Sequence, residues 1–263
     1  MMKIAIAGSG NVATHLALGL HAAGCEIVAV AGRTPAHAAE LAAKTGAPLS
    51  GGFDILRQCT GCADAVIVSL GDNAFSEIST LLPDFGKTPV FHTSGTIPME
   101  ALAPATRNYG IIYPLQTFSK DVEVDLARVP FFTEGRDDAT LALADKIAGM
   151  LSPKVAHADA AHRRVLHIAG VLSCNFPNYL WECVENLLAK AGYGLDVVEP
   201  LVRATVDKAF AVGPHASQTG PARRGDLDVI HSHARALGEP MDSVYLALSQ
   251  MIMDSHHVNS QSK

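Results

Sequence analysis

Apolar runs and helical patterns alternate along the first part of the chain. Short runs rich in Val, Ile and Ala predict strands at Lys3–Ala7, Glu26–Ala31, Ala65–Leu70, Pro89–Thr93, Tyr109–Tyr113, Val129–Thr133 and Lys154–His157. The spacing of the apolar residues between them predicts helices at Asn11–Ala23, Pro35–Lys44, Asn73–Leu82 and Asp137–Leu151. Ala65–Leu70 is almost continuously apolar, which is typical of a strand buried on both faces of a sheet. The alternation predicts an α/β fold with a mostly parallel sheet covered by helices.

The pattern changes at Ala158, after which no strand is predicted. An apolar stripe at helical spacing runs through Asp159–Ala191, and Pro177 lies inside it, so we expect a kink or a break near Ser173–Pro177. Further helices are predicted at Asp196–Val212 with Asp196 as N-cap, from Asp226 to just before Gly238, and at Asp242–Asp254, with a loop at Gly213–Gly225. We therefore expect two domains, residues 1–157 with the sheet and an all-α domain at residues 158–263.

A glycine motif follows the first predicted strand. Gly8-Ser9-Gly10-Asn11-Val12-Ala13 fits G-x-G-x-x-[GA], and it joins a predicted strand to a predicted helix. Gly8 would allow the tight turn and Gly10 the close approach of a pyrophosphate, whose charge a helix N-terminus stabilises. A glycine turn without a ligand is the alternative. We expect a doubly wound Rossmann domain in which Gly8, Ser9, Gly10, Asn11 and Val12 contact a dinucleotide.

The end of the second strand indicates which dinucleotide is bound. Sites that prefer NAD usually carry an acidic residue there, which accepts a hydrogen bond from the ribose 2′-hydroxyl. This chain has Arg33 and Thr34 instead, and an arginine can hold a 2′-phosphate with the threonine hydroxyl as a second donor. We expect NADP(H), the alternative being that Arg33 is a solvated surface residue.

Composition narrows the class of protein. Of 263 residues, 48% are hydrophobic and 17% charged, which gives enough apolar material for a core. The net charge of −6 argues against a nucleic-acid partner, and no apolar run is long enough to span a membrane or to form a secretory signal. Cys59 and Cys62 have C-x-x-C spacing but no second ligand pair, so we expect no metal site. We expect a soluble cytoplasmic protein.

Four sequence motifs, spread in order along the chain, are similar to those of a known family. They are His92-Thr93-Ser94-Gly95, Pro114-Leu115-Gln116-Thr117-Phe118, Ser173-Cys174-Asn175-Phe176 and Thr219-Gly220-Pro221-Ala222-Arg223-Arg224-Gly225-Asp226. The chain resembles Rossmann-like proteins with a C-terminal domain of unknown function 2520, relatives of pyrroline-5-carboxylate reductase and the β-hydroxyacid dehydrogenases. The resemblance implies an NADP-type oxidoreductase whose helical domain is of the 6-phosphogluconate-dehydrogenase-like type and forms a homodimer. This chain departs from many members at Tyr113, where they carry His.

Strand ends point to the nicotinamide half of the site. In a doubly wound sheet, ligands bind beyond the carboxyl ends of the strands, so we expect Ser69, Leu70 and Ser94 to border the cofactor. Asp72 in the same region is interpreted as a helix cap. Gln116 and Thr117 are polar residues between Leu115 and Phe118, which suits a wall that orients a substrate in an apolar pocket.

The predicted long helix carries candidates for proton transfer. His167 and Asn175 are eight residues apart and share a broad helix face. In the β-hydroxyacid dehydrogenase relatives the corresponding helix carries the proton donor, and histidine titrates near neutrality, so we expect His167 to donate and Asn175 to assist. The alternative is a structural pair at the Pro177 kink. Arg224 is a candidate ligand for a substrate carboxylate, the alternative being an ion pair with Asp226.

We therefore expect an NADP(H)-dependent reductase or dehydrogenase that acts on a small carbonyl, imine or hydroxy-acid substrate. The competing hypothesis is a non-catalytic NADP-binding sensor, whose helical domain serves as a surface for a partner. The sequence does not name the substrate, because a fold does not define a function.

Overall fold

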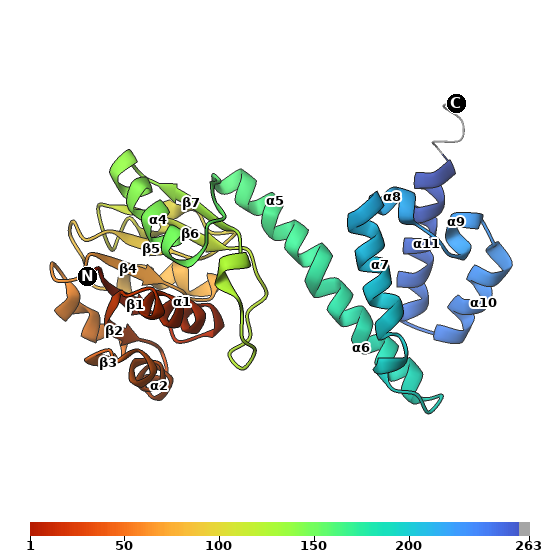
Figure 1. Cartoon of the computed structure of the whole chain (residues 1–263), viewed down its shortest axis with the longest axis horizontal. Helices are drawn as coiled ribbons and strands as arrows, with labels where there is room; N and C mark the ends of the chain where they lie inside the picture. Colours follow the sequence, from red (N-terminus) through yellow and green to blue (C-terminus); the bar gives the residue numbers. More distant parts are fainter. Residues whose placement is uncertain (258–263) are drawn as a thin grey trace. The chain divides into compact units, whose positions relative to one another are not determined.

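The computed structural model describes residues 1–257, and the chain forms two compact units that divide between Leu180 and Trp181 (Figure 1). Within the described residues, no helix combines the length and the apolar character needed to cross a membrane. The first unit contains the sheet and the beginning of the long helical segment, and the second contains helices.

One eight-stranded sheet organises the first unit in the order β3-β2-β1-β4-β5-β6-β7-β8. Every neighbouring pair is parallel except β6 and β7, which are antiparallel. The strands are β1 (Lys3–Ala7), β2 (Glu26–Ala31), β3 (Leu49–Gly51), β4 (Ala65–Val68), β5 (Val90–His92), β6 (Tyr109–Pro114), β7 (Phe131–Gly135) and β8 (Val155–His157). The strand order reverses between β1 and β4, which is where doubly wound sheets bind nucleotides.

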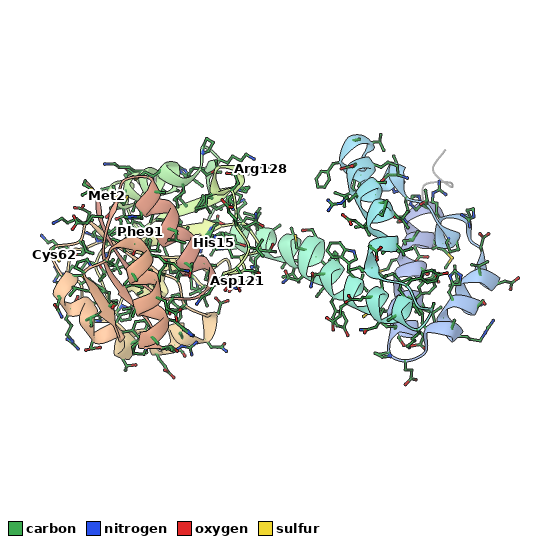
Figure 2. The ribbon with its side chains drawn as sticks, turned by 60° about the horizontal axis from the view of Figure 1, so that its bottom comes forward. Met2, His15, Cys62, Phe91, Asp121 and Arg128 are labelled. Carbon is green, nitrogen blue, oxygen red and sulfur yellow. The ribbon has the colours of Figure 1, made fainter. Side chains whose placement is uncertain are left out.

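Both faces of the sheet are buried, because successive side chains of a strand point to opposite faces. In β1, Ile4 and Ile6 pack toward α1 (Asn11–Ala22), α2 (Pro35–Thr45) and α4 (Asp138–Leu151). Ala5 and Ala7 belong to the opposite core, which is covered by short elements: η1 (Phe53–Cys59), η2 (Asp72–Glu77), α3 (Ile78–Leu81) and η3 (Met99–Leu102). Figure 2 labels Phe91, a fully buried residue of β5. The predicted doubly wound, mostly parallel sheet is confirmed.

One local prediction for the first unit was wrong, and two features of this unit were not predicted. The helix expected at Asn73–Leu82 is a 3-10 helix followed by a single α-turn. The strand β3 was not predicted, because Leu49-Ser50-Gly51 is too short to show a pattern. The reversal at β7 was not predicted either, since strand direction depends on how the chain crosses the sheet.

The long helical segment that begins in the first unit is distorted but not broken. The segments α5 (Ala160–Gly170), η5 (Val171–Asn175) and α6 (Phe176–Ala189) follow one another directly, and η5 is a π-helix. Pro177 lies just after η5 and has no backbone N–H, so the α-helical hydrogen bond that its position would require cannot form. The chain accommodates this with a π segment, where we expected a kink or a break.

The second unit is all helical apart from its turns. After η6 (Leu195–Val197), its α-helices are α7 (Glu199–Val212), α8 (Pro214–Ser217), α9 (Pro221–Arg224), α10 (Leu227–Leu237) and α11 (Met241–His257). Its buried residues are few, among them Ala222, Ile230 and Ala234. The prediction of Asp196 as N-cap was wrong: Asp196 lies in η6, and Val198 precedes α7. The expected loop at Gly213–Gly225 contains α8 and α9.

The boundary near residue 157 stays a proposal. It marks the end of β8, the last strand, and the start of the helices. The compact units divide further along the chain because α5 and η5 belong with the sheet.

Candidate functional site

The glycine turn after β1 is shaped by a close approach between two strands. Gly8 has φ +141°, and a Cβ at this position would overlap the carbonyl oxygen of Ser69, which follows β4. The Gly8 N–H donates to the carbonyl of Ala31 (2.7 Å), which ties the turn to β2 as well. The positive φ and the lack of room for a Cβ require glycine here, so Gly8 allows the chain after β1 to pass close to Ser69.

Gly10 has a different role from Gly8. It is the N-cap of α1, it has an ordinary φ of −82°, and it makes no side-chain capping bond. A Cβ built on Gly10 would meet no atom within 4 Å. The N-terminus of α1 therefore faces open space with its first-turn N–H groups uncapped, which is the arrangement that a phosphate requires.

The side chain of Asn11 holds a loop. Its amide donates to the carbonyl of Phe118 (2.9 Å), and the ring of His15 lies 2.9 Å from the carbonyl of Ser119. His15 on α1 and Asp121 in the loop border the same groove, and both are labelled in Figure 2. The loop that carries Gln116 and Thr117 is thereby fastened to the helix that begins at the glycine turn. The side chain of Asn11 thus binds the loop, and its backbone is left to contact a cofactor.

Arg33 and Thr34 lie after β2 and are both exposed. Within residues 1–257, Arg33 forms no ion pair, and Thr34 is the N-cap of α2 without a side-chain capping bond. A Cβ on Gly32 would lie 2.7 Å from the Ser9 hydroxyl, so Ser9 packs against the end of β2. The structure thus brings Ser9, Arg33 and Thr34 to one edge of the sheet with their polar groups available.

Ser94 is the centre of a hydrogen-bond network beyond β4 and β5. Its hydroxyl donates to Asp72 (2.8 Å) and accepts from the N–H groups of Thr96 and Ile97 (both 3.1 Å). The Thr96 hydroxyl also donates to Asp72. Asp72 was predicted as a helix cap, but Gly71 is the N-cap of η2 and the Asp72 carboxylate fastens the loop after β5. The Ser94 hydroxyl is therefore hydrogen-bonded to residues that follow both β4 and β5.

Ser69 and Leu70 follow β4 and are half-buried. The Ser69 hydroxyl accepts from Thr93 at 3.3 Å, and the Ser69 N–H donates to the carbonyl of Ala7 (2.8 Å). Ser69 therefore lies beside the glycine turn, and Leu70 follows it at the end of β4, the edge where we expect the cofactor.

His92, the last residue of β5, is a buried neutral histidine. Its Nδ1 accepts from the Ser94 N–H (3.2 Å), so its Nε2–H donates to the carbonyl of Pro98 (3.2 Å). Burial lowers the pKa of His92 to about 4, with the nearby Arg163 charge adding to the effect. The sequence analysis assigned His92 no role beyond a family phrase.

A cavity of about 300 Å³ brings together most of the predicted substrate and catalytic residues. Its lining includes Tyr113, Gln116, Thr117, His167 and Asn175. The Tyr113 hydroxyl lies 3.4 Å from Nδ1 of His167, and the Gln116 amide oxygen accepts from the N–H of Thr117 (2.8 Å). The π segment η5 supplies Asn175, together with Ser173 and Cys174, to the same wall. Such π segments occur frequently at functional sites.

Arg163 anchors α5 and was missed by the sequence analysis. Its side chain is fully buried, pairs with Glu134 of β7, and donates to the carbonyls of Ala158 (2.9 Å) and Ile97 (3.3 Å). Its Nε has no hydrogen-bond partner among the described residues. Arg163 lies one turn before His167, so this buried ion pair sets the start of the helix that carries His167.

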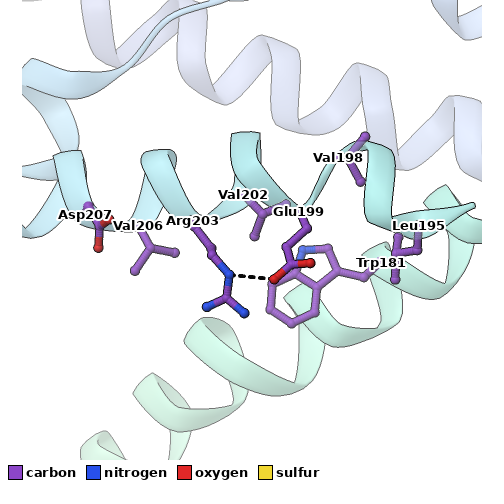
Figure 3. A pocket seen from close by; sticks show the side chains of 8 residues that line it. All are labelled: Trp181, Leu195, Val198, Glu199, Val202, Arg203, Val206 and Asp207. Atoms are coloured by element: carbon purple, nitrogen blue, oxygen red, sulfur yellow. Dashed lines mark hydrogen bonds and ion pairs between the residues drawn. The ribbon is translucent and has the colours of Figure 1, made fainter.

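Two polar features belong to the second unit. Arg224 in α9 makes an exposed ion pair with Asp226 (2.8 Å), which is the alternative that the sequence raised for it. A groove of about 420 Å³ is lined mostly by α7 and includes Trp181, and an Arg203–Glu199 ion pair (2.7 Å) runs along α7 beside it (Figure 3). No residue of this groove was predicted, because its apolar members look like ordinary core positions in the sequence.

Comparisons with known proteins agree with this architecture. A family described as a domain of unknown function (DUF2520) matches residues 129–252, and the shikimate/quinate 5-dehydrogenase family matches residues 1–76. No curated protein matches the chain.

Among solved structures, a Bacteroides fragilis protein described as a "putative NADP oxidoreductase" is 37% identical, with a TM-score of 0.87 over 96% of this chain and 98% of its own. A pyrroline-5-carboxylate reductase from Streptococcus pyogenes is 16% identical (TM-score 0.62, 97% of this chain and 98% of its own). A reductive aminase from Aspergillus terreus, in complex with NADPH and ethyl-5-oxohexanoate, is 17% identical (TM-score 0.70, 97% and 93%). The last two show the fold, whereas the first shows the family: the chain belongs to the Rossmann-like proteins that carry a C-terminal domain of unknown function 2520.

Proposed function

We propose that this protein is an NADP(H)-dependent oxidoreductase that transfers a hydride between the nicotinamide and a small carbonyl, imine or hydroxy-acid substrate. The observation that carries the proposal is the uncapped N-terminus of α1 behind Gly8 and Gly10, together with an exposed Arg33 at the end of β2 that forms no ion pair with any described residue. The family relative from Bacteroides fragilis and the NADPH complex of the reductive aminase support it.

The backbone of Gly8–Val12 would hold the pyrophosphate, because a Cβ at Gly10 would project into the space that the phosphates need. Arg33 and Thr34, with Ser9 beside them, would hold the 2′-phosphate. The bound nicotinamide supplies or accepts the hydride. Ser69, Leu70 and the loop of Ser94 would border its ring, since they lie beyond the carboxyl ends of β4 and β5.

The cofactor assignment is tested by substituting Arg33. Arg33→Ala should weaken NADPH binding by about 10- to 100-fold, because it removes a charge-assisted contact with the 2′-phosphate, and should leave NADH binding almost unchanged. Binding is measured by the nucleotide fluorescence of each cofactor. Arg57→Ala, at another exposed arginine of the first unit, is the matched control. Equal losses for both nucleotides, or a wild type that prefers NADH, would overturn the assignment.

The cavity beside Tyr113 would hold the substrate. In the proposal, Gln116 and Thr117 orient its polar group, His167 is the source of the proton, and Asn175 positions substrate next to the imidazole. Arg224 already has Asp226 as a partner, so we base the substrate site on the cavity residues alone.

Turnover separates the proposal from the competing sensor hypothesis. Consumption of NADPH is measured at 340 nm with a panel of keto acids, cyclic imines and aldehydes. Turnover of one class supports an oxidoreductase and names its substrate chemistry. Tight NADPH binding without turnover of any member would favour a non-catalytic sensor.

We also propose that the protein is a homodimer that forms through its helical part. Along α5, η5 and α6, Val165, Ile168, Leu172 and Phe176 follow helical spacing, and each is more than half exposed. Contiguous apolar surface of this kind marks interfaces in soluble proteins. Light scattering at micromolar concentration should give the mass of two chains, and a monomeric mass would refute the proposal.

A further inference from the structure

A tyrosine hydroxyl and a histidine ring meet at the cavity wall. We propose that Tyr113 donates a proton to the substrate and that His167 then donates a proton to Tyr113, so that the two side chains form a proton relay. This inference rests on the proposed oxidoreductase function, and it names the group that acts at the reacting atom.

The first support is the position of Tyr113. It lies in β6 with only 7% of its surface exposed, and its ring packs 6.4 Å from that of Phe132 on β7. Tyr113 nevertheless lines the cavity, and its hydroxyl lies 3.4 Å from Nδ1 of the half-buried His167, which lines the cavity as well. A phenol held by its buried ring, with its oxygen at a cavity, is placed as a proton donor must be placed.

The second support is Gly95, which leaves room for the phenol. A Cβ at Gly95 would lie 2.8 Å from Cζ and 2.9 Å from the hydroxyl oxygen of Tyr113. The backbone of Gly95 is fixed by its neighbour Ser94, whose hydroxyl is bound by Asp72 and by two N–H groups. The loop after β5 is therefore built against the hydroxyl end of the Tyr113 ring.

The relay balances in the direction of reduction. As hydride reaches the carbonyl carbon, the C=O double bond becomes single and its oxygen takes the O–H proton of Tyr113. The tyrosinate then takes the Nδ1 proton of protonated His167, and the imidazole regains a proton from water. An imine nitrogen takes the place of the oxygen without other change. Burial raises the pKa of Tyr113, which keeps the phenol protonated between turnovers.

Few other ionisable groups face the pair. Among the residues that line the cavity, the remaining titratable group is the Cys174 thiol, 3.6 Å from the Ser173 hydroxyl. Arg163, one turn earlier on α5, is paired with Glu134. The imidazole of His167 is therefore the group from which Tyr113 regains its proton in the proposed relay.

Substitution of Tyr113 tests the relay. Tyr113→Phe keeps the ring over Gly95 and removes the hydroxyl, so turnover should fall on the order of 10²-fold. NADPH affinity should be unchanged, because the hydroxyl does not belong to the proposed cofactor site. Tyr113→His restores a group that transfers protons and should recover at least tenfold over Tyr113→Phe. Tyr109→Phe is the matched control, because it removes a hydroxyl from the same strand, where the ring lies beneath Arg136 instead of in the cavity.

A second measurement needs no substrate. Nitrogen-15 spectra of the histidine rings should show that Tyr113→Phe changes the Nδ1 shift of His167, while Tyr109→Phe leaves it unchanged. A Tyr113→Phe enzyme with wild-type turnover, or an unchanged His167 signal, overturns the relay and leaves the oxidoreductase proposal standing. A wild type that binds NADPH but turns over no substrate overturns both.

Discussion

The sheet and the helices after it use their apolar side chains in opposite ways. Every residue of β4 is buried, as are all residues of β1 after Lys3. In contrast, α6 and α7 bury none of theirs, although apolar residues recur along both helices. The sheet is thus covered on both faces by its own chain, whereas the helices keep apolar surface exposed. We infer that the sheet contributes most of the stability of the chain and that the helices form the contacts between chains.

The largest difference in stability is expected between the alanine variants of two phenylalanines. Phe91 in β5 is fully buried, and Phe176 at the start of α6 is 56% exposed. Phe91→Ala should lower the free energy of unfolding by about 3–5 kcal/mol, because it removes a packed ring and leaves a cavity. Phe176→Ala should change it by less than about 1 kcal/mol in the same urea titration at low protein concentration. Equal losses would contradict the contrast.

Breaking a buried ion pair of the first unit should likewise cost more stability than breaking an exposed ion pair on α7. Glu134→Ala leaves the fully buried Arg163 without its carboxylate and should lower stability by about 3 kcal/mol. Glu199→Ala, the matched control on α7, removes the partner of the exposed Arg203 and should cost less than about 1 kcal/mol. Both are measured by chemical denaturation.

The double variant Arg163→Met with Glu134→Leu separates charge from packing. It should recover much of the loss, because no buried charge is then left unpaired. A double variant as unstable as Glu134→Ala would show that the loss does not come from an unpaired buried charge.

The predictable parts of the molecule are those whose signals are local. Strands with continuous apolar runs, such as β4, were found, and so was the glycine turn, because Gly8 and Gly10 follow a strand and open a helix. The cavity residues Gln116, Thr117, His167 and Asn175 were named from family motifs and helical spacing, and the structure places all four around the same cavity.

The parts that were missed depend on contacts between distant residues. Asp72 looked like a helix cap because Asp is common there, yet its carboxylate binds Ser94 and Thr96, more than twenty residues away. An arginine in a helix is usually exposed, so nothing near Arg163 in the sequence signals its burial. Gly95 gave no turn signal, because its role is to leave space for Tyr113.

The buried His92 gives the sheet a pH dependence. Its pKa is about 4 in the folded protein and about 6.5 in an unfolded chain, so between these values the unfolded state binds more protons. Stability should therefore fall as pH drops from about 6.5 to about 4, by up to roughly 3 kcal/mol from this group.

The variant His92→Gln should flatten that slope, measured as the urea midpoint at a series of pH values. His231→Gln replaces an exposed histidine of α10 and should leave the slope as in the wild type. A wild-type slope retained in His92→Gln would assign the pH dependence to other groups.

The smallest effect on stability is expected for a substitution that changes the oligomeric state. Leu172 in the π segment is 59% exposed and does not line the cavity, so Leu172→Glu should alter the stability of a single chain by less than about 1 kcal/mol. A charge buried in a dimer interface without a partner is strongly unfavourable, so the same substitution should shift the protein from dimer to monomer in light scattering at micromolar concentration. Val122→Glu adds the same charge at an equally exposed apolar residue of the first unit and should leave the mass unchanged. A Leu172→Glu variant that keeps the wild-type dimer mass would place the interface elsewhere, and the exposed stripe of α5 and α6 would then need another explanation.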